Sequence, residues 1–196
     1  MIDNFISNLQ DGIYHILHIG AYDHILFLIV LTLPYIFKDW KRILVLTSIF
    51  TAGHCLSLSL VTYNIISINI KVISLLIPLT ILITALFNIF TAGNKTHHTK
   101  IGLLFFIALF FGLIHGLGFA NDLNTLTSAS ENKFLAIIEI ALGIQIGQLV
   151  ISFIVIFLSF LCQTIFRFSK RDWIMVISSI VLGCVLPMLI NSGIFS

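Results

Sequence analysis

Long apolar runs constrain this chain more than any other feature of its sequence. A helix of roughly 20 residues, rising 1.5 Å per residue, crosses the hydrocarbon layer of a bilayer. Six runs approach or reach this length, at approximately Gly20 to Phe37, Ile43 to Tyr63, Ile70 to Phe90, Ile101 to Ala120, Phe134 to Phe160 and Trp173 to Ile190. They are uniformly apolar rather than alternating, which excludes a membrane β-barrel. Because 59% of the 196 residues are hydrophobic and only 9% are charged, we expect an all-α, polytopic membrane protein.

Residues 1–19 have a different pattern from the runs that follow. Apolar residues recur there at helical spacing, and polar residues mark the opposite stripe, which is typical of a helix lying in the membrane interface. No basic region precedes an apolar stretch, so no cleavable signal is expected. The sequence therefore predicts one membrane domain over 1–196, made of an interfacial amphipathic helix at 1–19 and a bundle of six transmembrane helices at 20–192.

The loops between the runs predict the orientation. Cytoplasmic loops carry an excess of Lys and Arg. Of the ten such residues in the chain, eight lie in the first, third and fifth loops: Lys38, Lys41, Arg42, Lys95, Lys100, Arg167, Lys170 and Arg171. Lys71 and Lys133 lie on the other side. We therefore expect a multi-pass protein of the cell (inner) membrane with both termini outside the cytoplasm.

Three histidines lie at similar depth on three different runs. At 1.5 Å per residue, His24, His54 and His115 are each roughly 17 to 21 Å above the cytoplasmic end of their run. Asp23 and Glu139 fall at a similar level. Ionisable groups inside a membrane are costly unless they are paired, hydrated or bound to metal, and imidazole with carboxylate suits borderline divalent ions such as nickel or zinc. These five residues are the predicted metal ligands.

Further polar residues extend the predicted site in both directions. Asp11, His15 and His18 share the polar face of the N-terminal helix, at a spacing that could capture a metal before it enters the membrane. On the cytoplasmic side, a pathway is predicted along these residues: Thr47, Thr51, Gln145 and Gln148. His97 and His98 lie in a basic loop, where a solvated role is expected because neighbouring cations oppose metal binding.

Three stretches resemble a known family. They are Tyr22-Asp23-His24-Ile25-Leu26-Phe27-Leu28, Phe50-Thr51-Ala52-Gly53-His54-Cys55-Leu56-Ser57-Leu58 and Phe111-Gly112-Leu113-Ile114-His115-Gly116-Leu117-Gly118-Phe119-Ala120. Their patterns and order resemble the HupE/UreJ family of small membrane proteins. That family is associated with nickel uptake beside hydrogenases and ureases. The resemblance implies a metal permease in which Asp23, His24, His54 and His115 are the motif residues.

The chain also departs from the family's pattern. Typical members carry glutamates where this chain has Ser74 and Phe87, and another glutamate where it has Gln145. Glu139 is a displaced carboxylate. The histidine layer is complete but the carboxylates are fewer, which indicates a divergent branch.

Three functions fit these features. The first is a permease or binding protein for a divalent transition metal, without a nucleotide-driven motor because no phosphate-binding loop is present. The second is an intramembrane zinc hydrolase, in which bound water is activated with help from Ser57 or Glu139. The third is an accessory subunit of a larger membrane complex with a structural metal. An enzyme is the less favoured class. The expected partners are the bilayer, the metal ion, and further copies of the chain or other membrane proteins, but not nucleic acid.

Overall fold

The described part of the chain is built from helices. The computed structural model describes residues 2–18, 20, 22–67, 69–93, 101–127 and 132–192. Its elements are α1 (Ile2–Leu17), α2 (Tyr22–Thr32), the short 3-10 helix η2 (Phe37–Asp39), α3 (Trp40–Thr62), α4 (Ile70–Thr91), α5 (Ile101–Thr127), α6 (Lys133–Thr164) and α7 (Lys170–Ile190). The all-α prediction is confirmed for these residues. His97 and His98 lie outside them, as do Lys95 and Lys100.

The prediction of six spans is met only in part. By length and composition, four helices are able to cross a membrane: Phe37–Thr62, which joins η2 to α3, and then α4, α6 and α7. Helices α1 and α2 make a fifth candidate if the pair, bent by 73°, is counted as one broken span. In α5 the apolar stretch, Leu104–Phe119, is shorter than the four helices that are long enough to cross a membrane.

The first predicted span is shorter than its apolar run. Helix α2 has 11 residues and ends at Thr32, whereas the run continues to Phe37. Pro34 explains the difference, because proline has no N–H to donate and disfavours helical backbone in the residue before it. The Thr32 hydroxyl, moreover, donates to the carbonyl of Leu28. Apolarity alone therefore overestimated the helical length of this segment.

Close packing of α3 against α5 depends on glycines. A Cβ atom at Gly112 would collide with the carbonyl oxygen of Phe50, and one at Gly116 would collide with the carbonyl oxygen of His54. Spacing of this small-xxx-small kind lets helix backbones approach closely. The contact matters for the site, since His54 lies on α3 and His115 on α5.

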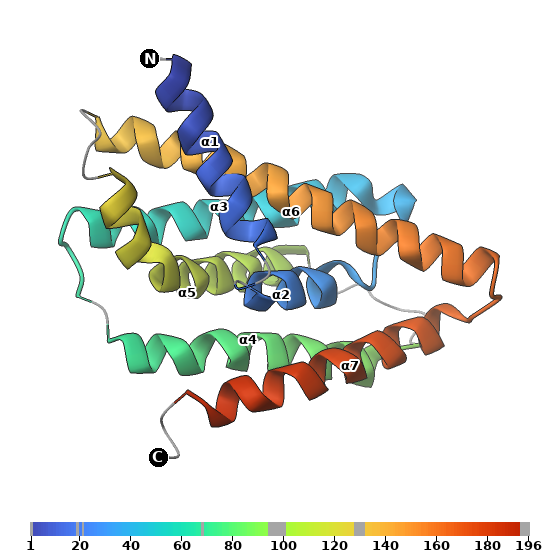
Figure 1. The fold of residues 1–196 in the computed structure, drawn as a ribbon. Coiled ribbons are helices and arrows are strands. Elements are labelled where there is room, and N and C mark those ends of the chain that lie inside the picture. The colour runs from blue at the N-terminus through green and yellow to red at the C-terminus, as the bar shows by residue number, and fades with distance from the viewer. Residues whose placement is uncertain are drawn as a thin grey trace.

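Helix α1 packs onto α6 in the same manner. Gly12 of α1 faces Gly143 of α6, and a Cβ at Gly12 would lie 3.0 Å from the Gly143 Cα. Ile16 is fully buried nearby. In Figure 1, α1 crosses α6 at a steep angle while its first turns project beyond the bundle. The C-terminal half of α1 is therefore part of the packed bundle, where the sequence predicted a helix at the membrane surface.

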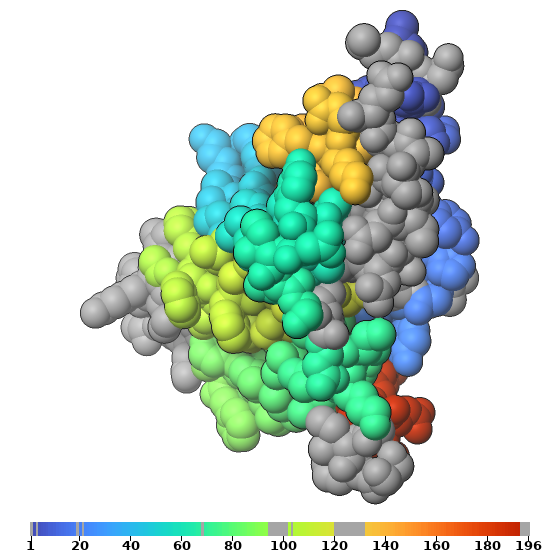
Figure 2. Space-filling view, turned by 90° about the vertical axis from the view of Figure 1, so that its left-hand side faces the viewer, coloured from blue at the N-terminus to red at the C-terminus, as the bar shows by residue number. Residues whose placement is uncertain are grey.

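Six of the eight described Lys and Arg residues collect at one end of the bundle, and Lys71 and Lys133, at the starts of α4 and α6, lie at the other. Helices α3 and α7 begin at the first of these ends, and α4 and α6 end there (Figure 1). Phe37, before α3, contacts Phe160 near the end of α6, with ring centroids 5.9 Å apart. Six exposed residues lie at this end: Lys38, Lys41, Arg42, Arg167, Lys170 and Arg171. We call it the cationic end. Figure 2 looks onto the opposite end, with α4 in green and the start of α6 in yellow-orange.

Candidate metal site

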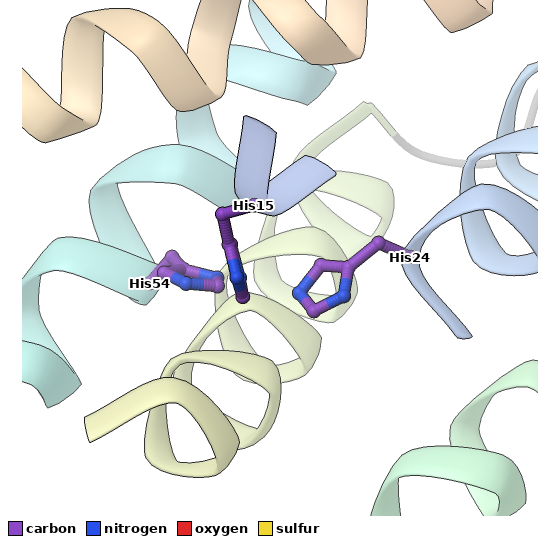
Figure 3. Close-up of side chains that lie close together, drawn as sticks. All are labelled: His15, His24 and His54. Carbon is purple, nitrogen blue, oxygen red and sulfur yellow. The ribbon is translucent and has the colours of Figure 1, made fainter. Parts of the chain in front are cut away.

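Three histidines from three helices converge in the interior. His15 comes from the last turn of α1, His24 from the first turn of α2, and His54 from the middle of α3. Each offers a nitrogen atom, and these atoms all lie within 4.8 Å of one another. Figure 3 shows the three rings pointing toward one place. Because Zn–N and similar bonds are about 2.0 to 2.1 Å long, one ion could contact all three rings after small side-chain adjustments.

His115 of α5 stands beside this group. Its ring centroid lies 5.3 Å from that of His24, comparable to the 5.7 Å between His24 and His54. His54 and His115 are fully buried, and His24 is 4% exposed. We call His15, His24, His54 and His115 the histidine cluster. The ligand atoms of His15, His24 and His54 converge, and His115 could add a fourth imidazole to a tetrahedral transition-metal site only after its ring moves closer.

Hydrogen bonds orient two of the four rings. The Nδ1–H of His24 donates to Oδ1 of Asp23 at 2.9 Å, and the same oxygen accepts from the His24 backbone N–H at 2.8 Å. The Nδ1–H of His115 donates to the carbonyl of Phe111 at 2.9 Å. In this tautomer the Nε2 atom of each ring keeps its lone pair. A carboxylate or carbonyl on the far nitrogen is the usual support for a metal-binding histidine.

Five of the six remaining ring nitrogens are buried without a partner. Among the described residues, no hydrogen bond reaches Nε2 of His15, His24 or His115, or either nitrogen of His54. Buried polar atoms are nearly always satisfied, by protein, water or an ion. A cluster of such atoms facing one another therefore indicates that an ion or ordered water belongs between them.

The other predicted ligands are placed differently. Glu139 is half-buried and accepts a hydrogen bond of 2.6 Å from Asn8, which lies seven residues before His15 on α1. It does not belong to the group whose ligand atoms converge. Asp23 supports His24 from outside the group. His18 is exposed, its ring contacts that of Tyr14 in a tilted arrangement, and its Nδ1 accepts from the backbone N–H of Gly20.

A cleft of about 880 Å³ leads to the cluster. His15, His24 and His115 line its depth, and the predicted capture residues Asp11 and His18 also line it. Its walls include the first residues of α4 and the last residues around α7: Ile70, Ser74, Asn191 and Ser192. These residues place the mouth at the end opposite the cationic end. The cleft thus gives the histidines access to water from one side.

Phenylalanines close the other side of the cluster. Phe27, Phe50 and Phe111 lie three or four residues from His24, His54 and His115 respectively, each toward the cationic end. Phe27 stacks on Phe50 with centroids 4.9 Å apart and contacts Phe111 at 5.8 Å. Phe27 and Phe50 also touch the His115 ring, at 4.8 and 5.2 Å. We call these three residues the aromatic floor.

The predicted pathway residues form a hydrogen-bonded group between α3 and α6. The Thr51 hydroxyl lies 2.7 Å from Oε1 of Gln145 and 3.2 Å from Oε1 of Gln148. The amide of Gln145 donates to the Thr47 hydroxyl at 3.0 Å. Thr51 is one turn from His54 toward the cationic end. The structure therefore brings all four residues together beside the aromatic floor.

The comparison with family models agrees with the motifs. The model described as HupE / UreJ protein matches residues 1–191. The chain belongs to the HupE/UreJ family. Neither a curated protein nor a solved structure is similar enough to this chain to count as a match. Membership of this family and the apolar helices identify a membrane protein associated with metal transport or an accessory role in it.

Sequence reasoning missed the position of His15 and the aromatic floor. It placed His15 on a surface helix, because the amphipathic stripe of residues 1–19 suited an interface. The sequence did carry one signal that α1 packs against another helix: Gly12 in α1, and the pair Gly143 and Gly147 in α6, are small residues of the kind that lets two helices approach closely. The aromatic floor could also have been predicted from the sequence, because Phe27, Phe50 and Phe111 each share a helix face with a predicted ligand.

Proposed function

We propose that this protein takes up a divalent transition-metal ion, nickel or zinc, from outside the cell and passes it toward the cytoplasm. The observation that carries the proposal is the histidine cluster: three buried imidazoles and the half-buried His15, with unpartnered nitrogens at the end of a water-accessible cleft. Imidazole favours borderline transition metals, whereas magnesium and calcium prefer oxygen ligands. The metal is the cargo in this proposal, held transiently by the cluster.

The charge distribution supports an inward direction. The cationic end is the cytoplasmic end by the positive-inside rule, so the cleft opens to the outside. On this topology α1 and α2 together form the first of six crossings, broken at the cluster, and both termini lie outside. Transporters often bind substrate where a crossing helix is discontinuous.

The geometry favours transport over hydrolysis. A zinc hydrolase needs a free carboxylate or hydroxyl beside the bound water. The residues suggested for that role are engaged elsewhere: Glu139 with Asn8, and the Ser57 hydroxyl with the carbonyl of His54.

Two measurements test the proposal. Purified protein is titrated with nickel and zinc by calorimetry, and metal entry into liposomes is followed with an enclosed fluorescent chelator. We expect binding and flux in the parent, and loss of both in His54→Ala. The double variant His97→Ala/His98→Ala is the matched control, because it removes imidazoles that sequence analysis assigns to a solvated loop. Binding without flux would reject transport in favour of an accessory role, and parental binding by His54→Ala would reject the site.

A further inference from the structure

Helix α2 ends with a backbone carbonyl that has lost its helical donor. In a continuous helix the carbonyl of Val30 would accept from the N–H of residue 34, but that residue is Pro34, which has no N–H. The side chain of Asn88, on α4, supplies a donor instead, and its Nδ2 atom lies 2.7 Å from the Val30 carbonyl oxygen. Val30 is fully buried and Asn88 is 3% exposed. Because an unsatisfied buried carbonyl is costly, this hydrogen bond fixes the end of α2 against α4.

The helix held in this way carries parts of both the histidine cluster and the aromatic floor. His24 is in its first turn, and Phe27 lies one turn further on, three residues before Val30. The Phe27 ring is fully buried and contacts the rings of Phe50 and Phe111. A displacement of α2 would therefore withdraw a metal ligand and open the aromatic floor in one movement.

The other helices that carry the histidine cluster are held by close backbone contacts. Glycines bring the backbones of α3 and α5 together at Gly53, Gly112 and Gly116, and those of α1 and α6 together at Gly12 and Gly143. No glycine in the described part of the chain makes such a contact with α2. Helix α2 has only 11 residues and is followed by the non-helical residues 33–36. It is therefore the ligand-bearing helix whose movement separates no backbone contact of this kind.

We propose that Asn88 is a positioning residue that keeps the aromatic floor closed by holding α2 in place. While the hydrogen bond to Val30 and the packing of Phe27 persist, the cleft ends at the histidine cluster and a metal ion cannot pass. An ion bound by the cluster also ties α2 to its neighbours and so favours the closed floor. Release by His24 and opening of the floor are then a single event, which prevents an open path through a loaded site. The role in release rests on the proposed function, whereas the closed floor does not.

Labelling of a cysteine behind the aromatic floor tests the proposal without any metal. Ala108 is 1% exposed and lies on α5, one turn from Phe111 toward the cationic end. Ala108→Cys, in a background without native cysteines, places a thiol there. A small impermeant cationic thiol reagent is added to sealed vesicles of the full chain on the side from which Ser7→Cys reacts. We expect almost no reaction of Ala108→Cys alone, and a reaction at least tenfold faster when Phe27→Ala or Asn88→Ala is added.

Two variants serve as matched controls. Thr84→Val alters α4 one turn before Asn88, where the Thr84 hydroxyl donates to the carbonyl of Thr80 in its own helix. Phe106→Ala removes a phenylalanine of α5 that is 67% exposed. Neither control should change the labelling rate.

Two outcomes would overturn the proposal. Rapid labelling of Ala108→Cys alone would show that the floor is not closed. Parental labelling in folded Asn88→Ala would show that Asn88 does not hold it. If Asn88→Ala does not fold, Asn88→Leu replaces it, because leucine resembles asparagine in shape but has no donor, and Phe27→Leu replaces Phe27→Ala in the same way.

Protection by nickel tests the role in release. Bound nickel ties α2 to its neighbours through His24, so it should slow the labelling of Ala108→Cys in the Asn88→Ala background several-fold. It should have no effect when His24→Ala is also present, which excludes an action of nickel on the new thiol. If the labelling without metal is as expected but the chain neither binds nor transports nickel, the proposed transport fails and the closed floor stands. Equal labelling with and without bound nickel would overturn the coupling between ligand and floor.

Discussion

Asp23 contacts His24 twice, and its removal separates two ways in which a carboxylate can support a metal ligand. Its Oδ1 atom accepts from the ring and from the backbone N–H of His24, at 2.9 and 2.8 Å. It orients the ring, and it also adds negative charge near the ion. Asp23→Asn retains an oxygen that can accept these hydrogen bonds but has no charge, whereas Asp23→Ala loses both.

The charge effect can be estimated from the geometry. The hydrogen bond, the width of the imidazole ring and a metal–nitrogen bond of about 2 Å put the carboxylate roughly 7 Å from the ion. A divalent ion and a unit charge at that separation attract by about 5 kcal/mol at an effective dielectric constant of 20, and by about 1 kcal/mol in water. The Asp23 side chain is 22% exposed and lines the cleft, so we take a value nearer the lower figure. About 1.4 kcal/mol is a tenfold loss of affinity.

We therefore expect a graded series. Asp23→Asn should bind metal about tenfold more weakly than the parent, and Asp23→Ala about 100-fold, at the upper end of the range for partners of ligating histidines. His24→Ala should lose more than Asp23→Ala, because a ligand itself is removed. Calorimetric titration at matched folding and expression measures the series. Parental affinity in Asp23→Asn would refute the charge argument, and parental affinity in Asp23→Ala would refute the orienting role as well.

Three further predictions follow from the packing, the ligands and the charges. Gly116→Ala should lower the melting temperature, at a cost of about 1 to 3 kcal/mol for overpacking, while Gly183→Ala should not, because a Cβ at Gly183 meets nothing within 4 Å; equal melting temperatures would show that α3 and α5 can move apart freely. Metal affinity should fall once the pH is low enough to protonate the cluster imidazoles, since protonated imidazole cannot bind metal; undiminished affinity in folded protein at about pH 3, far below the ordinary pKa of imidazole, would exclude histidine ligands. In a background without native cysteines, Ser7→Cys should react with an impermeant reagent from outside and Lys170→Cys only after the membrane is opened, and the reverse pattern would invert the orientation.

The sequence predicted the histidines better than it predicted the helices that carry them. Depth along an apolar run depends only on the rise per residue, so counting placed His24, His54 and His115 at one level. Helix length depends on local chemistry as well, and Pro34 ended α2 well before the run ended. Apolarity reports where a segment lies in the membrane, whereas proline and glycine decide where its helices stop and how closely they pack.

Glu139 illustrates the limit of depth as a guide to site membership. It was assigned to the ligand layer because it enters its helix at a similar level. Depth, however, leaves the rotation of the helix undetermined, and Glu139 lies on the face of α6 that meets α1, where Asn8 donates to it. His15 shows the converse. Its membership depends on α1 packing against α6, a tertiary contact that hydrophobic periodicity within residues 1–19 does not reveal.

The break between α1 and α2 accounts for both the cluster and its access to water. On a continuous helix, His15 and His24 would be about 13.5 Å apart along the axis, yet their ring centroids lie 4.6 Å apart. Only a turn of the chain between them allows one crossing to supply two ligands. Helix ends leave backbone groups that need partners, and within a membrane these must face protein or a water-filled cavity. Gly20 and Tyr22, at the break, line the cleft. The same interruption that brings the histidines together therefore requires water beside them, and the aromatic floor separates that water from the cytoplasmic side.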